Sequence, residues 1–141
     1  IMQLSEELTR LFTLLTRITS DHQRSAELAR PDFQVLGRLV RAEALRPSDL
    51  AQLEGLDQST LSRRVAALAE RGLIERQSDP DDRRAQFLRV TEAGHAAYNA
   101  EQARRVQLVT DAVAHWSSPE RAELVRLLHE LNESLQQRIL P

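Results

Sequence analysis

The chain has 141 residues, a formal net charge of −2, 41% hydrophobic residues and 28% charged residues. This length and composition predict one compact unit with a hydrophobic core and a charged surface. The absence of cysteine excludes disulfides, thiol nucleophiles and thiol-based redox sensing. There is no apolar run near the ~18 residues of a membrane span and no signal-peptide pattern, so we expect a cytoplasmic protein. Any contact with nucleic acid must come from local placement of its arginines, because the overall charge is negative.

Leucines recur at four- and three-residue spacing near the N-terminus, which predicts a helix over 4–18 with a narrow seam of the coiled-coil kind. Such a seam usually needs a partner helix. We call it the N-terminal seam, and its leucines are Leu4, Leu8, Leu11 and Leu15.

Two further helices are predicted over 31–44 and 47–54, each with a proline at its first turn. Gly55 suits the end of the second, since glycine readily adopts the left-handed conformation of a helix C-cap.

The segment 57–78, DQSTLSRRVAALAERGLIERQS, predicts a short amphipathic helix followed at once by a strand. Leu61, Val65 and Leu68 form its apolar stripe, while Asp57 or Ser59 can serve as its N-cap. Together with the helix before Gly55 it matches the helix-turn-helix pattern. By itself this pattern is weak, and an ordinary packed helix pair fits it about equally well.

Strands are predicted over 73–77 and 87–91, and the polar turn SDPDDRRAQ joins them. This hairpin would carry Arg83 and Arg84 at its tip, where an arginine can enter a narrow, electronegative minor groove. Asp82 can hold the Arg84 guanidinium extended through a bidentate pair. The alternative, a metal or acid–base cluster of the loop aspartates, is disfavoured because the neighbouring arginines neutralise them.

The motif TEAG at 91–94 predicts the start of a long helix that runs to about Trp116, and Pro119 opens a last helix. Two copies of the chain burying their leucine seams against each other explain more of the pattern than one copy folding upon itself. The leucines of the last helix form the C-terminal seam: Leu124, Leu128, Leu131 and Leu135.

The strings LDQSTLSRRVAALAERGLIER (56–76) and DPDDRRAQFLRVTEAG (79–94) resemble the MarR family of bacterial transcription regulators, and the order of elements agrees over nearly the whole chain. The second string is the more specific, since it joins a D-x-R tip to an L-x-V-T-x-x-G helix start. The resemblance implies a mainly α fold with a small β-hairpin wing, a winged helix-turn-helix with N- and C-terminal dimerisation helices. It divides the chain into a dimerisation helix at 1–30, a DNA-binding lobe at 31–94 and dimerisation helices at 95–141.

The family consists of homodimers that bind pseudo-palindromic promoter sites, usually as repressors, and are often released by a small, frequently phenolic, anion. By position, the resemblance makes Arg84 the minor-groove arginine and Asp82 its orienting partner. Arg46 departs from the family, because relatives tend to have a capping Ser or Thr there; this arginine weakens the helix start or reaches a phosphate. The expected DNA-contacting residues are Ser48, Gln58, Ser59, Thr60, Ser62, Arg63, Arg64, Asp82, Arg83 and Arg84.

An effector would lodge between the dimerisation helices and the DNA-binding lobe, although plain core is the favoured interpretation of each plausible lining residue and an exposed polar position is an alternative for His22. These residues are Leu11, Phe12, His22, Phe33 and Leu36. The other histidines have no metal-ligand spacing, so neither a metal nor a cofactor is expected. A protein-interaction module is an alternative that the arginines disfavour. An enzyme is a second one, disfavoured by the lack of a nucleophile–base pair, phosphate loop or metal cluster.

Overall fold

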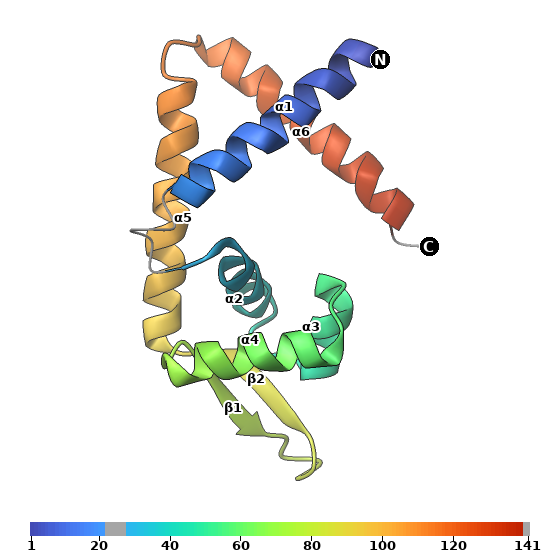
Figure 1. Cartoon of the computed structure of the whole chain (residues 1–141), viewed down its shortest axis with the longest axis vertical. Helices are drawn as coiled ribbons and strands as arrows, with labels where there is room; N and C mark the ends of the chain where they lie inside the picture. The colour runs from blue at the N-terminus through green and yellow to red at the C-terminus, as the bar shows by residue number, and fades with distance from the viewer. Residues whose placement is uncertain (22–27, 140–141) are drawn as a thin grey trace. The chain divides into compact units, whose positions relative to one another are not determined.

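The protein is represented by a computed structural model that describes residues 1–21 and 28–139 (Figure 1). The described residues contain six helices and one β-hairpin, which confirms the predicted mainly α fold class with a hairpin wing. In chain order the elements are α1 (Met2–Asp21), α2 (Arg30–Ala42), α3 (Pro47–Glu54), α4 (Gln58–Glu70), β1 (Ile74–Ser78), β2 (Gln86–Val90), α5 (Glu92–Ala112) and α6 (Ser118–Ile139).

The chain divides into two compact units, residues 1–103 and 104–141. The first contains the helix-turn-helix, the hairpin and their hydrophobic core; the second contains the end of α5 and the whole of α6. The division by role into 1–30, 31–94 and 95–141 is a different partition and stays a prediction.

The core of the first unit is built from leucine and valine side chains of α2, α3, α4 and β2. Leu36 and Leu39 of α2, Leu50 of α3, Leu68 of α4 and Leu88 of β2 are all fully buried. Each lies on the apolar stripe of its element, and burying such a side chain contributes ~1.5 to 3 kcal/mol. This shared core fixes α4 against α3 and the hairpin.

The long helix α5 ends at Ala112, so the prediction that it reaches about Trp116 is wrong. The backbone tightens after that point: the Ala114 amide donates to the Asp111 carbonyl, and the Trp116 amide donates to the Val113 carbonyl. These i to i−3 bonds replace the α-helical i to i−4 pattern and end the helix.

A reciprocal capping arrangement then begins α6. The Ser117 amide and hydroxyl both donate to Glu120 Oε2 at 2.7 Å, and the Glu120 amide donates back to Ser117 Oγ at 3.4 Å. The hydrogen bond from the Ser117 hydroxyl also lowers the pKa of Glu120. The sequence pattern S-x-x-E therefore sets where this helix starts.

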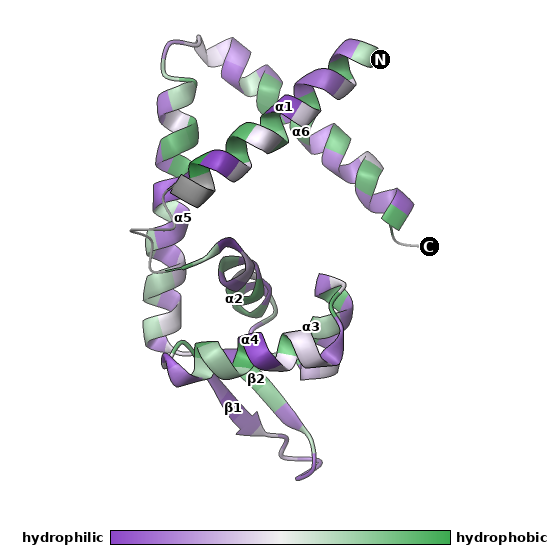
Figure 2. Cartoon of the chain, in the orientation of Figure 1, coloured by the Kyte–Doolittle hydropathy of each residue, from purple (hydrophilic) through white to green (hydrophobic). Residues whose placement is uncertain are grey.

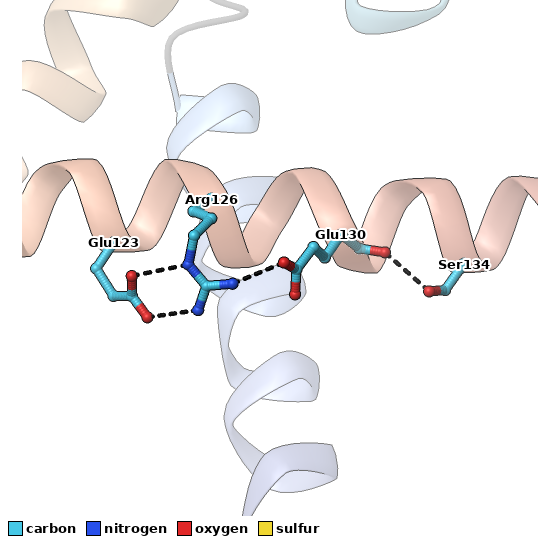
Figure 3. A network of polar contacts seen from close by, with 4 residues as sticks. All are labelled: Glu123, Arg126, Glu130 and Ser134. Carbon is cyan, nitrogen blue, oxygen red and sulfur yellow. Dashed lines mark hydrogen bonds and ion pairs between the residues drawn. The ribbon is translucent and has the colours of Figure 1, made fainter.

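One face of α6 carries a polar network (Figure 3). The Arg126 guanidinium donates to both carboxylate oxygens of Glu123, at 2.9 and 2.7 Å, and to Glu130 Oε1 at 2.6 Å, while Ser134 Oγ donates to the Glu130 carbonyl. Exposed ion pairs of this kind add little stability. They do show which face of α6 suits water, and at 3.6 residues per turn the C-terminal seam lies on a different face.

Candidate nucleic-acid interface

Helix α4 begins with a well-formed N-cap at Asp57. Its carboxylate accepts from the Thr60 amide at 2.7 Å, from the Ser59 hydroxyl at 2.7 Å and from the Thr60 hydroxyl at 2.9 Å. Of the two predicted caps, Asp57 is the one used. The Ser59 hydroxyl bond is the main reason that the pKa of Asp57 falls to about 2, with Thr60 adding to the effect.

This cap changes what Ser59 and Thr60 can do at a DNA surface. Both hydroxyl protons already bond to Asp57, so neither hydroxyl can donate to a phosphate without first leaving the cap. Their oxygen lone pairs remain available as acceptors. We therefore expect these two residues to shape the helix start more than to hold phosphates, which the residue pattern alone did not indicate.

The rest of α4 separates cleanly into a buried and an exposed face. Leu61, Val65 and Leu68 are buried in the core, as their spacing predicted. The other face carries donors and acceptors at the surface: Gln58, Ser59, Ser62 and Arg63 are exposed, and Thr60 and Arg64 are half-buried. A short helix anchored by one face and polar on the other has the form needed to read base edges in a major groove.

Helix α3 is tied to α4 by the tight turn at Gly55. Gly55 adopts the left-handed conformation (φ 63°) and its amide donates to the Gln52 carbonyl at 3.2 Å, while the Leu56 amide donates to the Ala51 carbonyl at 2.9 Å. This confirms the predicted glycine C-cap. At the other end of α3, Ser48 is exposed in the first turn, next to Pro47.

Strands β1 and β2 pair antiparallel, with Ile74 opposite Val90 and Ser78 opposite Gln86. Each of the four strand boundaries lies one residue away from the predicted one. Figure 2 shows β1 as almost entirely hydrophilic, in keeping with a wing whose outer part faces water. Residues 79–85 form the tip that joins the strands, and Arg83 and Arg84 are exposed there.

Two aspartates shape this tip by bonding to backbone amides. Asp79 Oδ1 accepts from the Asp81 amide at 2.8 Å, and Asp82 Oδ1 accepts from the Arg84 amide at 3.0 Å. Both are the two-residue-forward bonds typical of Asx turns. The Ala85 amide adds a bond to the Asp82 carbonyl at 3.0 Å.

The expected bidentate pair between Asp82 and the Arg84 guanidinium is replaced in this structure by the bond to the Arg84 amide. Asp82 thus orients Arg84 through the backbone of the turn rather than by holding its side chain. The guanidinium is left extended into solvent at an exposed position.

Thr91 and Gly94 connect the end of the wing to α5. The Thr91 amide donates to the Leu73 carbonyl at 3.1 Å, the Thr91 hydroxyl donates to the Gly72 carbonyl at 2.5 Å, and the Gly94 amide donates to Thr91 Oγ1 at 3.1 Å. A side chain at Gly94 would overlap the Leu73 carbonyl oxygen. These contacts explain why the motif T-x-x-G follows the wing.

Arg46 is the residue whose placement the sequence pattern missed. It occupies the N-cap position of α3 and makes no side-chain cap bond. Its guanidinium Nη2 instead lies 2.8 Å from Asp79 Oδ2 at the base of the wing tip. We expected Arg46 to weaken the helix start or to reach a phosphate, and neither expectation included this ion pair.

The predicted effector residues lie in different environments. Leu36 is fully buried in the core, whereas Leu11 and Phe12 are 44% and 63% exposed on α1. Phe33 stacks on Tyr98 with ring centroids 4.8 Å apart. His22 lies outside the described residues. A cavity of about 240 Å³ is lined by Phe33, Gln34, Gly37, Arg38, Arg41, Glu54 and Tyr98.

Both leucine seams contain exposed apolar side chains in the isolated chain. Leu4 and Leu15 of the N-terminal seam are 59% and 41% exposed, and Leu128 and Leu135 of the C-terminal seam are 40% and 49% exposed. Leu11 is also exposed. The remaining members are half-buried: Leu8, Leu124 and Leu131.

The described residues offer neither a metal site nor a membrane-spanning helix. Among residues 1–21 and 28–139, the structure brings together no group of three or more histidine, aspartate or glutamate side chains able to hold a metal ion. No helix within this described part is long and apolar enough to cross a bilayer.

Comparison with known proteins identifies the family. Residues 28–85 match the family model described as the MarR family. The HTH-type transcriptional regulator YxaD of Bacillus subtilis (strain 168) is 31% identical over 128 residues, which span 91% of this chain and 90% of YxaD. This chain belongs to the MarR family. Family membership confirms that it is a transcription regulator with a DNA-binding fold and not an enzyme.

Solved structures agree with the winged helix fold of this MarR family member. A MarR family protein from Bacillus stearothermophilus superposes with a TM-score of 0.88 at 19% identity, covering 95% of this chain and 94% of that one. Streptococcus pneumoniae FabT, solved in complex with DNA, superposes with a TM-score of 0.81 at 20% identity, covering 96% and 97%. At these identities the likeness establishes the fold.

Proposed function

We propose that this regulator is a homodimeric repressor that binds a pseudo-palindromic promoter site, with α4 in the major groove and the wing tip in the minor groove. The observation that carries the proposal is the exposure of Arg84 at the tip of a wing held to the core that supports α4. A relative of the same fold has been solved with DNA bound. Sequence would be read by base-edge contacts from α4, and affinity would come from arginines on phosphates.

The two-copy arrangement is supported by the exposed seams on α1 and α6. The exposed leucines recur on one face of each helix, and contiguous apolar patches on a protein surface are typical of an interface. Two copies would present two wings and two α4 helices to half-sites about one helical turn apart, ~34 to 36 Å.

Release by a small ligand, for which we propose an aromatic acid, completes the proposed function. The cavity beside Phe33 supports it, because Arg41 offers a cation for a carboxylate and the stacked rings of Phe33 and Tyr98 offer an apolar wall. Phe33 is one of the five residues predicted to line such a site. Leu36 is buried in the core and does not line this cavity, and the roles of Leu11, Phe12 and His22 stay predictions.

The test is a mobility-shift titration with the DNA upstream of the protein's own gene, against a scrambled duplex of the same length. Arg63, Arg64, Arg83 and Arg84 from two copies give eight candidate contacts. If all eight neutralise phosphates or enter grooves and each displaces counterions as a phosphate contact does, log affinity should fall with log salt at a slope of ~7, from ~0.9 per contact. Equal affinity for both duplexes would contradict the proposed specific regulator. A panel of aromatic acids added to the complex then tests release.

A further inference from the structure

Arg46 joins the start of the helix-turn-helix to the wing across 33 residues of sequence. Its Nη2 lies 2.8 Å from Asp79 Oδ2, and its guanidinium carbon lies 5.4 Å from the centre of the Phe87 ring. The Arg46 side chain therefore contacts the wing at two places: at Asp79, directly after β1, and at Phe87, in β2. Contacts of these two kinds, an ion pair and a cation–π contact, fix a guanidinium in direction as well as in distance.

The carboxylate of Asp79 is the buried half of this contact. Asp79 is 5% exposed, and its second oxygen accepts from the Asp81 amide at 2.8 Å. Its own amide donates to the Ala85 carbonyl at 3.0 Å, which closes the base of the tip. Asp79 is thus the point from which the tip with Arg84 extends.

The backbone beside Arg46 is attached to the wing as well. The Leu45 amide donates to the Leu88 carbonyl at 3.2 Å, and the Leu88 amide donates to the Leu45 carbonyl at 2.8 Å. This bridge anchors the middle of β2. The Arg46–Asp79 pair adds a second anchor further out, at the base of the tip.

We propose that Arg46 is a positioning residue that holds the wing tip at a fixed place relative to α3 and α4, so that Arg84 enters the minor groove in register with the major-groove helix. The inference rests on the proposed function for its consequence at DNA, but the anchor itself is independent of DNA. Without the pair, the tip would become ordered only when DNA binds, and the free-energy cost of that ordering would weaken binding. With the pair, the tip is already ordered in the free protein.

A direct contact between Arg46 and a phosphate is the competing interpretation. The two interpretations predict opposite changes in DNA affinity for Asp79→Asn. Asp79→Asn removes a negative charge from the wing, which by simple electrostatics strengthens DNA binding. The positioning role predicts that the same change weakens binding, because the anchor of Arg46 is lost.

Hydrogen exchange on the free protein tests the anchor first. In Arg46→Gln we expect the amides of Asp81, Arg84 and Ala85 to exchange faster than in the unaltered protein. The matched control is Arg38→Gln, which removes the same charge and a similar 2.8 Å pair, Arg38–Glu54, in the same lobe. Unchanged exchange of the tip amides in Arg46→Gln would overturn the proposal.

Operator affinity tests the consequence. Arg46→Gln and Asp79→Asn should each weaken binding about 5- to 30-fold for each wing that contacts DNA, the factor for re-ordering one residue of backbone. The double variant should be no weaker than either single one, and the effect of Arg46→Gln should shrink when Arg84 is alanine. Unfolding midpoints of the single variants are compared with that of Arg38→Gln to confirm that each is folded.

Asp79→Asn binding at least as tightly as the unaltered protein would overturn the positioning role and leave Arg46 as a phosphate contact. Losses of operator-binding free energy that add up when Arg46→Gln and Arg84→Ala are combined would also overturn the positioning role. If Arg84→Ala alone leaves the affinity unchanged, the proposed minor-groove function fails. The exchange experiment still decides whether Arg46 anchors the tip, so the two failures are distinguishable.

Discussion

Replacing Gly94 by alanine tests how tightly the wing is joined to α5. The new Cβ would overlap the Leu73 carbonyl oxygen and would lie 2.6 Å from Val90 Cγ1. Because one of these neighbours is backbone, relief requires β1 and α5 to move apart. That movement strains the bond from the Thr91 amide to the same Leu73 carbonyl.

The magnitude follows from three contributions. Overpacking of this kind costs ~1 to 3 kcal/mol. Weakening the Thr91 bond adds up to ~1 kcal/mol. The better helix propensity of alanine offsets up to ~1 kcal/mol. We therefore expect Gly94→Ala to lower the free energy of unfolding by about 1 to 3 kcal/mol, from the overpacking estimate with the other two cancelling.

Urea unfolding at one fixed protein concentration measures this loss, since dimer stability would depend on concentration. Gly37→Ala is the matched control: its Cβ would lie 3.2 Å from Tyr98 Cε2 and 3.4 Å from Arg41 Nη1, which are side-chain atoms rather than backbone and are much farther away than the Leu73 carbonyl oxygen is from a Cβ at residue 94. We expect this control to change stability by less than ~1 kcal/mol. Equal stability of the two variants would refute the argument that the Leu73 carbonyl excludes a side chain at residue 94.

Two further predictions concern the start of α4 and the C-terminal seam. The pKa of Asp57 is lowered from 3.8 to about 2 in the folded protein, so its stabilising contribution is complete above about pH 4 and is lost as the pH falls toward 2. Asp57→Asn should flatten the pH dependence of unfolding in that window, and an unchanged acid transition would contradict this. Leu128→Asp should dissociate or unfold the protein in sedimentation experiments, because the proposed interface would bury a charge. Arg126→Ala on the polar face is its control, and an intact dimer of Leu128→Asp would count against the seam.

Much of the fold followed from local sequence pattern. The buried stripe of Leu61, Val65 and Leu68 and the glycine after α3 were predictable because helix periodicity and capping involve residues within a turn of each other. The wing was predictable for the same reason: two short strands flank a turn rich in aspartate. The end of α5 was not, because apolar residues at helical spacing continue to Trp116, whereas the last i to i−4 bond is that of the Val113 amide to the Val109 carbonyl.

The sequence predicted which residues belong to the candidate site better than it predicted what those residues contact. The pattern singled out Arg84 and Asp82 but gave the wrong atom for their contact, since a side chain two residues before another can bond to its amide or to its guanidinium. The Arg46–Asp79 pair joins residues 33 apart, and only the folded core brings them together. No local pattern carries that information.

The most direct test of the central claim is the operator affinity of Arg84→Ala measured beside Arg121→Ala. The second variant removes the same charge from α6, which contributes none of the proposed DNA-contacting residues. We predict that Arg84→Ala weakens specific binding at least tenfold, about 1.4 kcal/mol, and flattens its salt dependence. Its dimer and its thermal stability should stay nearly unchanged, and Arg121→Ala should bind normally. Unaltered affinity of a folded Arg84→Ala dimer would contradict the assignment of the wing as a minor-groove reader.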